Sequence, residues 1–355
     1  MARMGIDCRF ATAFGGLGRY TRELVTALLH LPAAGEYTLF VQDENEEWLS
    51  TIRSSTTKII EAPYPHYSLQ EQLHFPRILS RSKIDLLFVP HFNVPLFCPV
   101  PYVITVHDLI LHRYPNQASF LKRIAYRLVM RHAVHHAKRI ITVSHFTQSE
   151  LTRAYPKLLP ERLQIVTEGV HERFTPQSDE VCRNVREKFS LEKPFFLSVG
   201  NAKEHKNIRM LIDAFHMQSD SACELVLVTG GKEAENLREE NGVRILRDVT
   251  DGDLPALYSS ATALVTASLY EGFCLPIAEA QACGCPVIAT NTSAIPEIAS
   301  TSALLLEPTV EAFAKAFVHP PIRPVSRWDP PRWQSAAEKT HAILTSVLSS
   351  SHGSY

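Results

Sequence analysis

Two glutamates in the stretch SLYEGFCLPIAEAQACGCPVIAT, residues 268–290, are spaced so that they could act on one ligand. Glu271 and Glu279 lie on either side of a short loop that ends at Pro276. Proline favours the first turn of a helix, and the alanines after it favour continuation of the helix. Strand-like apolar runs flank the stretch. The pattern therefore predicts a strand, a loop, a helix and a strand, with both carboxylates beside the start of the helix.

A helix start at the carboxyl end of a parallel strand attracts phosphate, because free backbone N–H groups and the positive end of the helix dipole meet there. Carboxylates would repel phosphate, but they accept hydrogen bonds well from adjacent hydroxyls. A ligand with sugars on both sides of a diphosphate, a nucleotide sugar, fits both properties. An alternative remains, in which Glu279 is a favourable first-turn acid and Glu271 a solvated loop residue.

Two lysines in LSVGNAKEHKNIRMLIDAF indicate a second anion site. Lys203 and Lys206 precede a helix that is predicted to begin near Asn207. Cations at a helix start are unfavourable for the dipole, so an anion between them would explain their position. A solvated basic turn is the alternative, and it suits Lys203 better than Lys206.

A glycine-rich loop, FGGLGRYT, follows the first predicted strand. Gly15, Gly16 and Gly18 would let the backbone approach a phosphate closely. The dinucleotide fingerprint is broken, because Thr21 occupies the place of its third glycine. Asp43, after the next strand, keeps a dehydrogenase interpretation open, although a loop acid within the polar run DENEE is the simpler explanation.

A histidine and an aspartate follow another predicted strand, in VITVHDL. His107 and Asp108 would lie at its carboxyl end, where polar pairs are more often part of a site than of a core. His91, in HFNVP, could line the same opening or could be a satisfied loop residue.

We expect no metal site and no disulfide framework. Asp251 and Asp253 have a spacing that could hold a metal ion, but Asp253 directly precedes a predicted helix and is better explained as an N-cap. Cys274, Cys283 and Cys285 lack a paired CxxC partner. The total of 7 cysteines is odd and scattered, which argues against a set of disulfides.

Composition describes an ordinary globular protein of 355 residues with a formal net charge of −1 and 45% hydrophobic residues. Nothing in that balance indicates nucleic-acid binding. Because the sequence shows no signal peptide and no apolar run of membrane-spanning length, we expect a cytoplasmic protein, at most peripheral at the inner face of the membrane. One segment, 119–140, is strongly basic. It could rest on an anionic membrane or a lipid-linked acceptor, or it could be a solvated helix face.

Apolar runs alternate with helix-like stretches along the chain, which indicates parallel α/β architecture. The polar stretch 171–180 separates two series of strands and is interpreted as a linker. The predicted strands are MGIDCRF, YTLFVQ, KIIEAP, DLLFVP, PYVITVH, RIITVS and LQIVTEG, followed by PFFLSVG, ELVLVTG, VRILRDV, ATALVTA, PVIAT and ALLLEP. A proline-rich stretch then precedes a last amphipathic helix.

Taken together, these motifs closely resemble the family-4 retaining glycosyltransferases, and SLYEGFCLPIAEAQACGCPVIA is the most specific of them. The resemblance implies the GT-B fold, with two Rossmann-like domains facing a central cleft. The first would comprise residues 1–172 and bind the acceptor. The second, 173–332, would bind the nucleotide sugar, and the last helix, 333–349, would return to the first domain.

The resemblance also implies roles for particular residues. Glu279 would bind the ribose hydroxyls, Glu271 the transferred sugar, and Lys206 the leaving diphosphate. His107 would be the active-site histidine near the donor sugar. Such enzymes need no metal and no cofactor. The other donor-binding positions are Gly16, Gly200, Asn201, Gly272, Phe273, Cys274 and Leu275, with the last three supplying backbone N–H groups to the diphosphate.

This sequence departs from the family at three positions. A glycine is commoner at position 274 and a proline at 267, where Cys274 and Ala267 stand. Asn201 takes the place of a frequent arginine, which leaves more of the phosphate charge to Lys206.

The expected function is transfer of a hexose from a nucleoside diphosphate sugar to a glycan or lipid-linked acceptor. The motifs are similar to those of bacterial mannosyltransferases of surface-polysaccharide assembly, which favours GDP-mannose as donor. The alternatives are a transferase that uses a UDP-sugar, an NAD-dependent dehydrogenase, and a non-catalytic protein that binds sugar nucleotides.

Overall fold

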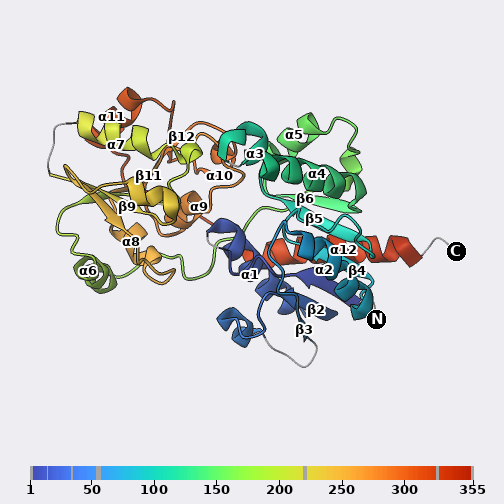
Figure 1. Cartoon of the computed structure of the whole chain (residues 1–355). Helices are drawn as coiled ribbons and strands as arrows, with labels where there is room; N and C mark the ends of the chain where they lie inside the picture. The colour runs from blue at the N-terminus through green and yellow to red at the C-terminus, as the bar shows by residue number, and fades with distance from the viewer. Residues whose placement is uncertain are drawn as a thin grey trace. The chain divides into compact units, whose positions relative to one another are not determined.

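The structure is a computed structural model of the whole chain (Figure 1). It describes residues 3–13, 15–32, 35–52, 57–117, 119–218, 222–324 and 328–352. The chain divides into two compact units. Unit 1 comprises Met1–Gly169 and Pro331–Tyr355, and unit 2 comprises Val170–Pro330. The sequence analysis placed the same two divisions after residue 172 and before residue 333.

Unit 1 is built on a sheet of seven parallel strands in the order β3-β2-β1-β4-β5-β6-β7. The strands are β1 Arg3–Asp7, β2 Glu36–Val41, β3 Thr57–Glu61, β4 Leu86–Val89, β5 Tyr102–Val106, β6 Arg139–Thr142 and β7 Leu163–Ile165. The helices are α1 Gly16–Leu29, α2 Leu69–Ser82, α3 Ile110–Arg113, α4 Phe120–His136, α5 His145–Ala154 and α12 Trp333–His352. Short 3₁₀ turns are η1 Glu47–Thr51, η2 Pro115–Gln117 and η3 Pro160–Arg162.

Unit 2 has six parallel strands in the order β10-β9-β8-β11-β12-β13. The strands are β8 Phe195–Val199, β9 Glu224–Val228, β10 Val243–Leu246, β11 Ala263–Thr266, β12 Val287–Thr290 and β13 Leu304–Leu306. The helices are α6 Asp179–Lys188, α7 Ile208–Met217, α8 Leu254–Ser260, α9 Leu275–Ala282, α10 Ile295–Ile298 and α11 Val310–Val318. The 3₁₀ turns are η4 Glu204–Lys206 and η5 Lys232–Asn236.

Every strand that the sequence predicted is present, and the expected pair of Rossmann-like parallel sheets is confirmed. The central strands are buried along their whole length, as in β4, β5 and β11. Burial on both faces explains their continuous apolar runs. The linker prediction was partly wrong. Asp179 and Glu180 form the first turn of α6, because Ser178 caps that helix by accepting a hydrogen bond from the N–H of Val181.

The last helix, α12, belongs to unit 1 and packs along α1 (Figure 1). Two contacts fix its start. A Cβ on Gly169 would lie 2.2 Å from the backbone nitrogen of Trp333, so only glycine allows this approach. The Trp333 ring also packs on the ring of Tyr20 from α1, with centroids 5.6 Å apart. The chain is therefore closely packed at the point where it re-enters unit 1.

Candidate functional site

The loop between β11 and α9 in unit 2 holds Gly272, Phe273 and Cys274 of the predicted donor-binding residues, and Leu275 begins α9. Cys274 precedes α9 in a left-handed conformation, with φ 81° and ψ 65°. This turn aims the chain into α9, where Pro276 stands in the first turn as the sequence predicted. Within the described part of the chain, the backbone N–H groups of Phe273, Cys274 and Leu275 find no hydrogen-bond acceptor. The loop thus presents donors that an anion could accept.

A cation lies at the same edge of the sheet. Lys206 ends η4, and its Nζ is 2.5 Å from Oε1 of Glu271. Both side chains are mostly buried, and the N–H of Glu271 is held by Oγ of Ser293 at 2.9 Å. The Lys206–Glu271 ion pair joins the two anion sites that the sequence indicated separately.

Glu279 points into the interior of unit 2. Its side chain lies on α9, is almost fully buried and accepts a hydrogen bond from the hydroxyl of Tyr258 at 3.0 Å. Glu279 is the fifth residue of α9 and lies beyond its first turn, so the alternative of a first-turn acid is wrong. A buried carboxylate is retained where polar partners hold it.

A small hollow of about 10 Å³ lies at the carboxyl ends of β8, β9 and β11. Gly200, Asn201 and Lys206 line it, together with Thr229, whose buried hydroxyl has no hydrogen-bond partner within the described residues. Gly200 has φ +150°, which favours glycine. The predicted donor-binding residues between β8 and α7 thus lie beside Thr229, which follows β9 and was not predicted.

The glycines of the first loop have different reasons to be glycine. Gly15 has φ +90°, and a Cβ on Gly18 would lie 2.0 Å from the carbonyl oxygen of Ala13. Among the described residues, a Cβ on Gly16 would meet nothing within 4 Å. Unit 1 therefore does not require glycine at position 16, which leaves room for a ligand there.

His107 lies at the end of β5 with both ring nitrogens facing protein acceptors. Nε2 is 2.9 Å from the carbonyl oxygen of Pro90, and Nδ1 is 3.4 Å from Oε1 of Glu168. Burial alone would lower the pKa of His107, but Glu168, the hydrogen bond to Pro90 and the charge of Asp108 together outweigh it, so that the pKa is raised. The neighbouring His91 ring packs between Phe10 and Phe92, and burial lowers its pKa well below the usual value.

The sequence analysis missed two features of this edge of unit 1. One is Glu168, which follows the short strand β7 and gives no local signal. The other is a fully buried ion cluster. Arg9 donates to Asp7 at 2.7 and 2.8 Å, and its Nη2 lies 2.8 Å from Oε1 of Glu71. The charged residue in GIDCRF could have suggested such a cluster, since buried arginine needs partners.

Asp253 stands at the N-cap position of α8 but makes no capping hydrogen bond with its side chain, so the predicted capping role is wrong. Its carboxylate instead pairs with Lys188 at 2.7 Å and accepts from the N–H of Thr250. Among the described residues, no group of three or more His, Cys, Asp or Glu side chains is arranged to hold a metal ion.

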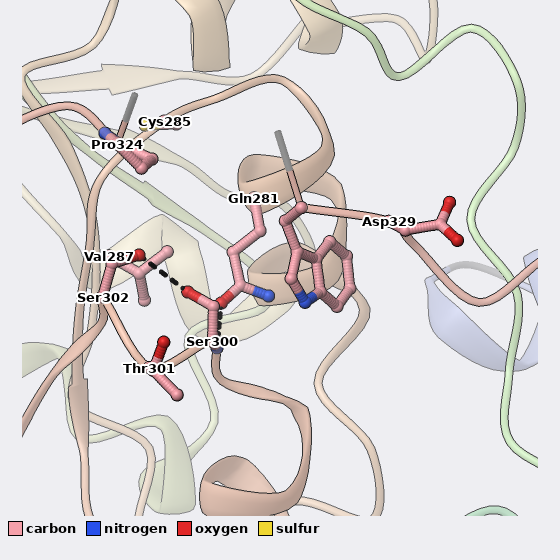
Figure 2. Close-up of a pocket in the computed structure, with 9 residues that line it drawn as sticks. Gln281, Cys285, Val287, Ser300, Thr301, Ser302, Pro324 and Asp329 are labelled. Carbon is pink, nitrogen blue, oxygen red and sulfur yellow. Dashed lines mark hydrogen bonds between the residues drawn. The ribbon is translucent and has the colours of Figure 1, made fainter. Parts of the chain in front are cut away.

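A larger cavity, about 230 Å³, lies elsewhere in unit 2 (Figure 2). Gln281, Ser300 and Ser302 are among its lining residues, but their polar groups already bond one another and the backbone. Oε1 of Gln281 accepts from the N–H of Ser300, and Ser300 bonds Ser302 at 2.9 Å. This cavity offers a ligand little that is unsatisfied, and we place no function there.

Comparison with known proteins agrees with this arrangement of sheets and loops. A family model described as Glycosyltransferase Family 4 matches residues 14–174, and one described as Glycosyl transferases group 1 matches residues 183–318. Together they span well over half of the chain. The fold is that of a GT-B protein. The chain belongs to the family-4 GT-B glycosyltransferases and resembles the bacterial mannosyltransferases among them.

Two curated relatives are O-antigen mannosyltransferases. The chain is 31% identical over 221 residues to O-antigen chain mannosyltransferase B of Escherichia coli, covering 58% of this chain and 57% of that one. It is 29% identical over 234 residues to O-antigen chain mannosyltransferase RfbU of Salmonella typhimurium, covering 64% and 62%. The matched stretches thus span less than two thirds of these relatives.

Solved structures share the fold across nearly the whole chain. Anabaena HepE in complex with UDP and glucose has a TM-score of 0.70 at 17% identity, covering 99% of this chain and 100% of that one. WaaG, a glycosyltransferase involved in lipopolysaccharide biosynthesis, also has a TM-score of 0.70 at 17% identity, covering 97% and 100%. At such low identity the likeness supports the fold alone.

Cys274 gives a test of the loop geometry. A left-handed conformation costs a non-glycine residue about 1–2 kcal/mol, and Cys274 bears this cost at φ 81°. Glycine would relieve the strain but lose buried side-chain contacts, whereas alanine would lose the contacts and keep the strain. We therefore expect Cys274→Gly to be at least as stable as Cys274→Ala in urea unfolding. In regular structure, glycine variants are usually less stable than alanine variants. A less stable glycine variant would show that the loop is not held in this conformation.

Proposed function

We propose that the chain is a retaining glycosyltransferase that moves a hexose from a nucleoside diphosphate sugar to a glycan or lipid-linked acceptor. The loop before α9 carries this proposal. It combines the N–H groups at residues 273–275, which are unpaired within the described chain, with the cation of Lys206, and carboxylates lie in the loop, at Glu271, and in α9, at Glu279. Family membership supports the same reaction.

The leaving diphosphate gains negative charge as the glycosidic bond breaks. Donors that are already oriented stabilise such charge without further reorganisation. We assign this role to the N–H groups of Phe273, Cys274 and Leu275 and to Lys206, so that no metal ion is required. Gly16, Gly200, Asn201 and Gly272 would allow close approach of the donor, and His107 would act near its sugar.

The two glutamates receive different roles. We assign the transferred sugar to Glu271 and the ribose hydroxyls to Glu279, whose carboxylate is held in place by Tyr258. Glu271 forms an ion pair with Lys206, and the donor diphosphate would replace this carboxylate as the partner of the lysine. Releasing Glu271 would also free it to accept hydrogen bonds from sugar hydroxyls.

GDP-mannose is the donor that we propose first, because the two curated relatives are named as mannosyltransferases. A UDP-sugar is the alternative, since a solved neighbour was crystallised with UDP and glucose. A dehydrogenase is disfavoured by the first loop. There Gly18 packs on Ala13, and the hydroxyl of Thr21 bonds the carbonyl of Leu17 within α1. A non-catalytic sugar-nucleotide-binding protein would bind donors without transfer.

A donor panel tests the proposal. Ligands that bind the folded state raise the melting temperature by mass action, so GDP-mannose should raise it more than UDP-glucose, ADP-glucose, NAD or NADP. Transfer to extracted glycan or lipid acceptors should then proceed in EDTA. A shift with NAD alone would overturn the proposal, and binding without turnover would favour the non-catalytic alternative. Loss of transfer in EDTA that magnesium or manganese restores would contradict the metal-free mechanism.

Glutamine substitutions test the different roles of Glu271 and Glu279. If Glu279 holds ribose equally in ground and transition states, Glu279→Gln should mainly raise the donor KM. Glu271→Gln should mainly lower kcat, because positive charge develops on the sugar beside it. The ion pair adds a sharper expectation. Glu271→Gln removes the carboxylate that competes with phosphate for Lys206. The bare nucleoside diphosphate should therefore bind this variant more tightly than the parent protein. Equal kinetic effects of the two substitutions would show that the ligand is placed wrongly.

A surface of unit 1 suits an acceptor held in a membrane. Large apolar side chains stand exposed on α2, on the loop before β5 and on α4, namely Leu69, Leu73, Leu96, Phe97, Phe120, Leu121, Ile124 and Leu128. Two contacts bring these elements together. The N–H of Leu96 bonds Gln72 of α2 at 2.8 Å, and Phe92 packs on Tyr126 of α4 at 5.2 Å.

The charges on these two helices are basic. α4 carries no acid and exposes Arg127 and Arg131, and α2 exposes Arg77 and Arg81, while its acid, Glu71, is buried against Arg9. Exposed apolar side chains beside basic ones bind the interface of anionic bilayers. Within the described part of the chain, no helix is long and apolar enough to cross a membrane. We therefore propose peripheral docking of unit 1 on an anionic bilayer.

Vesicle sedimentation tests this docking. The protein should bind vesicles that contain anionic phosphatidylglycerol at low salt and should be released as salt rises, because the Debye length falls to about 8 Å near physiological ionic strength. Phe97→Ser combined with Leu121→Ser should weaken binding, whereas Ile322→Ser, at an exposed apolar residue of unit 2, should not. Equal absence of binding to neutral and anionic vesicles would leave α4 as a solvated helix.

A further inference from the structure

Glu168 is the one acid among the described residues that stands within 4 Å of a ring nitrogen of His107, and no role follows for it from the donor site described above. Its side chain is 8% exposed, and that of His107 is 16% exposed. The pair lies at the carboxyl ends of β5 and β7 within unit 1. A buried carboxylate beside a buried imidazole stabilises the charged ring.

The hydrogen bonds of His107 determine where its protons are. The carbonyl oxygen of Pro90 can only accept, so Nε2 carries the hydrogen of the 2.9 Å contact. Nδ1 faces an oxygen of Glu168 at 3.4 Å, and an ionised carboxylate is also an acceptor only. Both ring nitrogens are therefore matched to their partners only when each carries a hydrogen. That form is the imidazolium.

The backbone holds Glu168 in this place. Gly169 lies against the backbone of Trp333, where a side chain would collide, so the preceding residue cannot shift along that path. The Trp333 ring packs on Tyr20, and the Tyr20 ring packs edge-on against His107 with centroids 4.4 Å apart. Glu168 is thus connected to His107 directly and also through a series of packed neighbours, from Gly169 to Trp333 of α12 and Tyr20 of α1.

We propose that Glu168 is the positioning residue of His107: it accepts the Nδ1 hydrogen, keeps the ring charged and fixes the direction of both N–H groups. The assignment of a catalytic consequence rests on the proposed function, in which His107 acts near the donor sugar. A charged ring has no lone pair on nitrogen. His107 would then act as a hydrogen-bond donor to a sugar oxygen, and it would not take a proton from the acceptor hydroxyl.

The 3.4 Å contact to Glu168 is longer than the contact to Pro90, so Nδ1 is the nitrogen that a substrate could share. A hydroxyl that replaced this direct contact would accept from Nδ1–H and donate to the carboxylate. The pair would thus recognise a hydroxyl in both of its hydrogen-bonding roles, which a lone histidine or a lone glutamate cannot do.

Other groups also influence the charge of the ring. Asp108 is adjacent in sequence and favours the charged form, whereas His91, with ring centroids 6.3 Å away, disfavours it when charged. The hydroxyl of Tyr20 is engaged with Thr105 and stays neutral, since burial raises its pKa. Glu168 gives the largest stabilisation of the charged form, and its influence raises the pKa of His107 against the effect of burial.

Glu168→Gln tests the pairing directly. Glutamine keeps the shape and the hydrogen-bonding oxygen but removes the charge, so the pKa of His107 should fall. NMR titration of the imidazole protons measures this change, with His107→Asn used to identify the signal. Glu161→Gln, at an exposed acid remote from the ring, is the matched control and should leave the titration unchanged. An unchanged His107 titration in a folded Glu168→Gln protein would overturn the proposal.

The pH dependence of transfer tests the consequence. The charged form of His107 is present below its pKa and is lost as pH rises through it, so the alkaline limb of kcat/KM should move to lower pH in Glu168→Gln. At pH values above the His107 pKa of both proteins, the amount of imidazolium is proportional to the proton affinity of the ring. If that affinity is about tenfold weaker in Glu168→Gln, the variant has about tenfold less imidazolium than the parent protein, and its rate should be lower by the same factor. At low pH the rate should approach that of the parent protein.

The two readouts separate the pairing from the proposed function. A changed NMR titration with an unchanged rate profile would keep Glu168 as the partner of His107 and would remove His107 from the transfer reaction. A rate lowered equally at every pH, with the titration unchanged, would show a merely structural role for Glu168 and would overturn the proposal.

Discussion

The close approach of Gly169 to the backbone of Trp333 is the constraint on which the functional edge of unit 1 depends. Few positions in the chain leave a Cβ so little space, with the nearest backbone nitrogen 2.2 Å away. The contact closes unit 1, because α12 begins there and packs along α1. The contact also affects the site. The Trp333 ring packs on Tyr20, and the Tyr20 ring packs edge-on against His107. Helix α12, from the last part of the sequence, therefore packs around a histidine that the first half of the chain positions.

The corresponding constraint in unit 2 is the left-handed turn at Cys274. By entering α9 through that turn, the chain leaves its first N–H groups without partners among the described residues and places Glu271 and Lys206 together. Each charge satisfies the other while no ligand is bound, which avoids the cost of an isolated buried charge. A diphosphate would bring enough negative charge to replace the carboxylate. The ion pair would thus stabilise the loop, and a bound diphosphate would take the place of Glu271 beside Lys206.

The sequence was sufficient for the strands and for the start of α9, but it was not sufficient for interactions between distant segments. Apolar runs report burial directly, which is why both sheets were predicted. The capping role of Asp253 failed because Lys188, 65 residues earlier in the chain, pairs with it. Glu168 was missed for the same reason, since its partner is 61 residues away. A single acid after a short strand has the same local pattern whether it is solvated or paired.

The buried ion cluster of Arg9 shows how charge fixes the loops around His107. Arg9 follows β1, Glu71 begins α2, and Asn93 follows β4, so the cluster ties together three loops at the carboxyl edge of one sheet. Burial would raise the pKa of Glu71, but hydrogen bonds and the charge of Arg9 lower it. Removing one partner of a buried pair costs about 3–5 kcal/mol, whereas well-packed apolar residues can replace the whole set without loss. Stability alone therefore does not explain the cluster. Its directional hydrogen bonds specify loop positions that an apolar core would leave less defined, and those loops carry Phe10, Tyr67 and Phe92, whose rings pack against His91, the neighbour of His107.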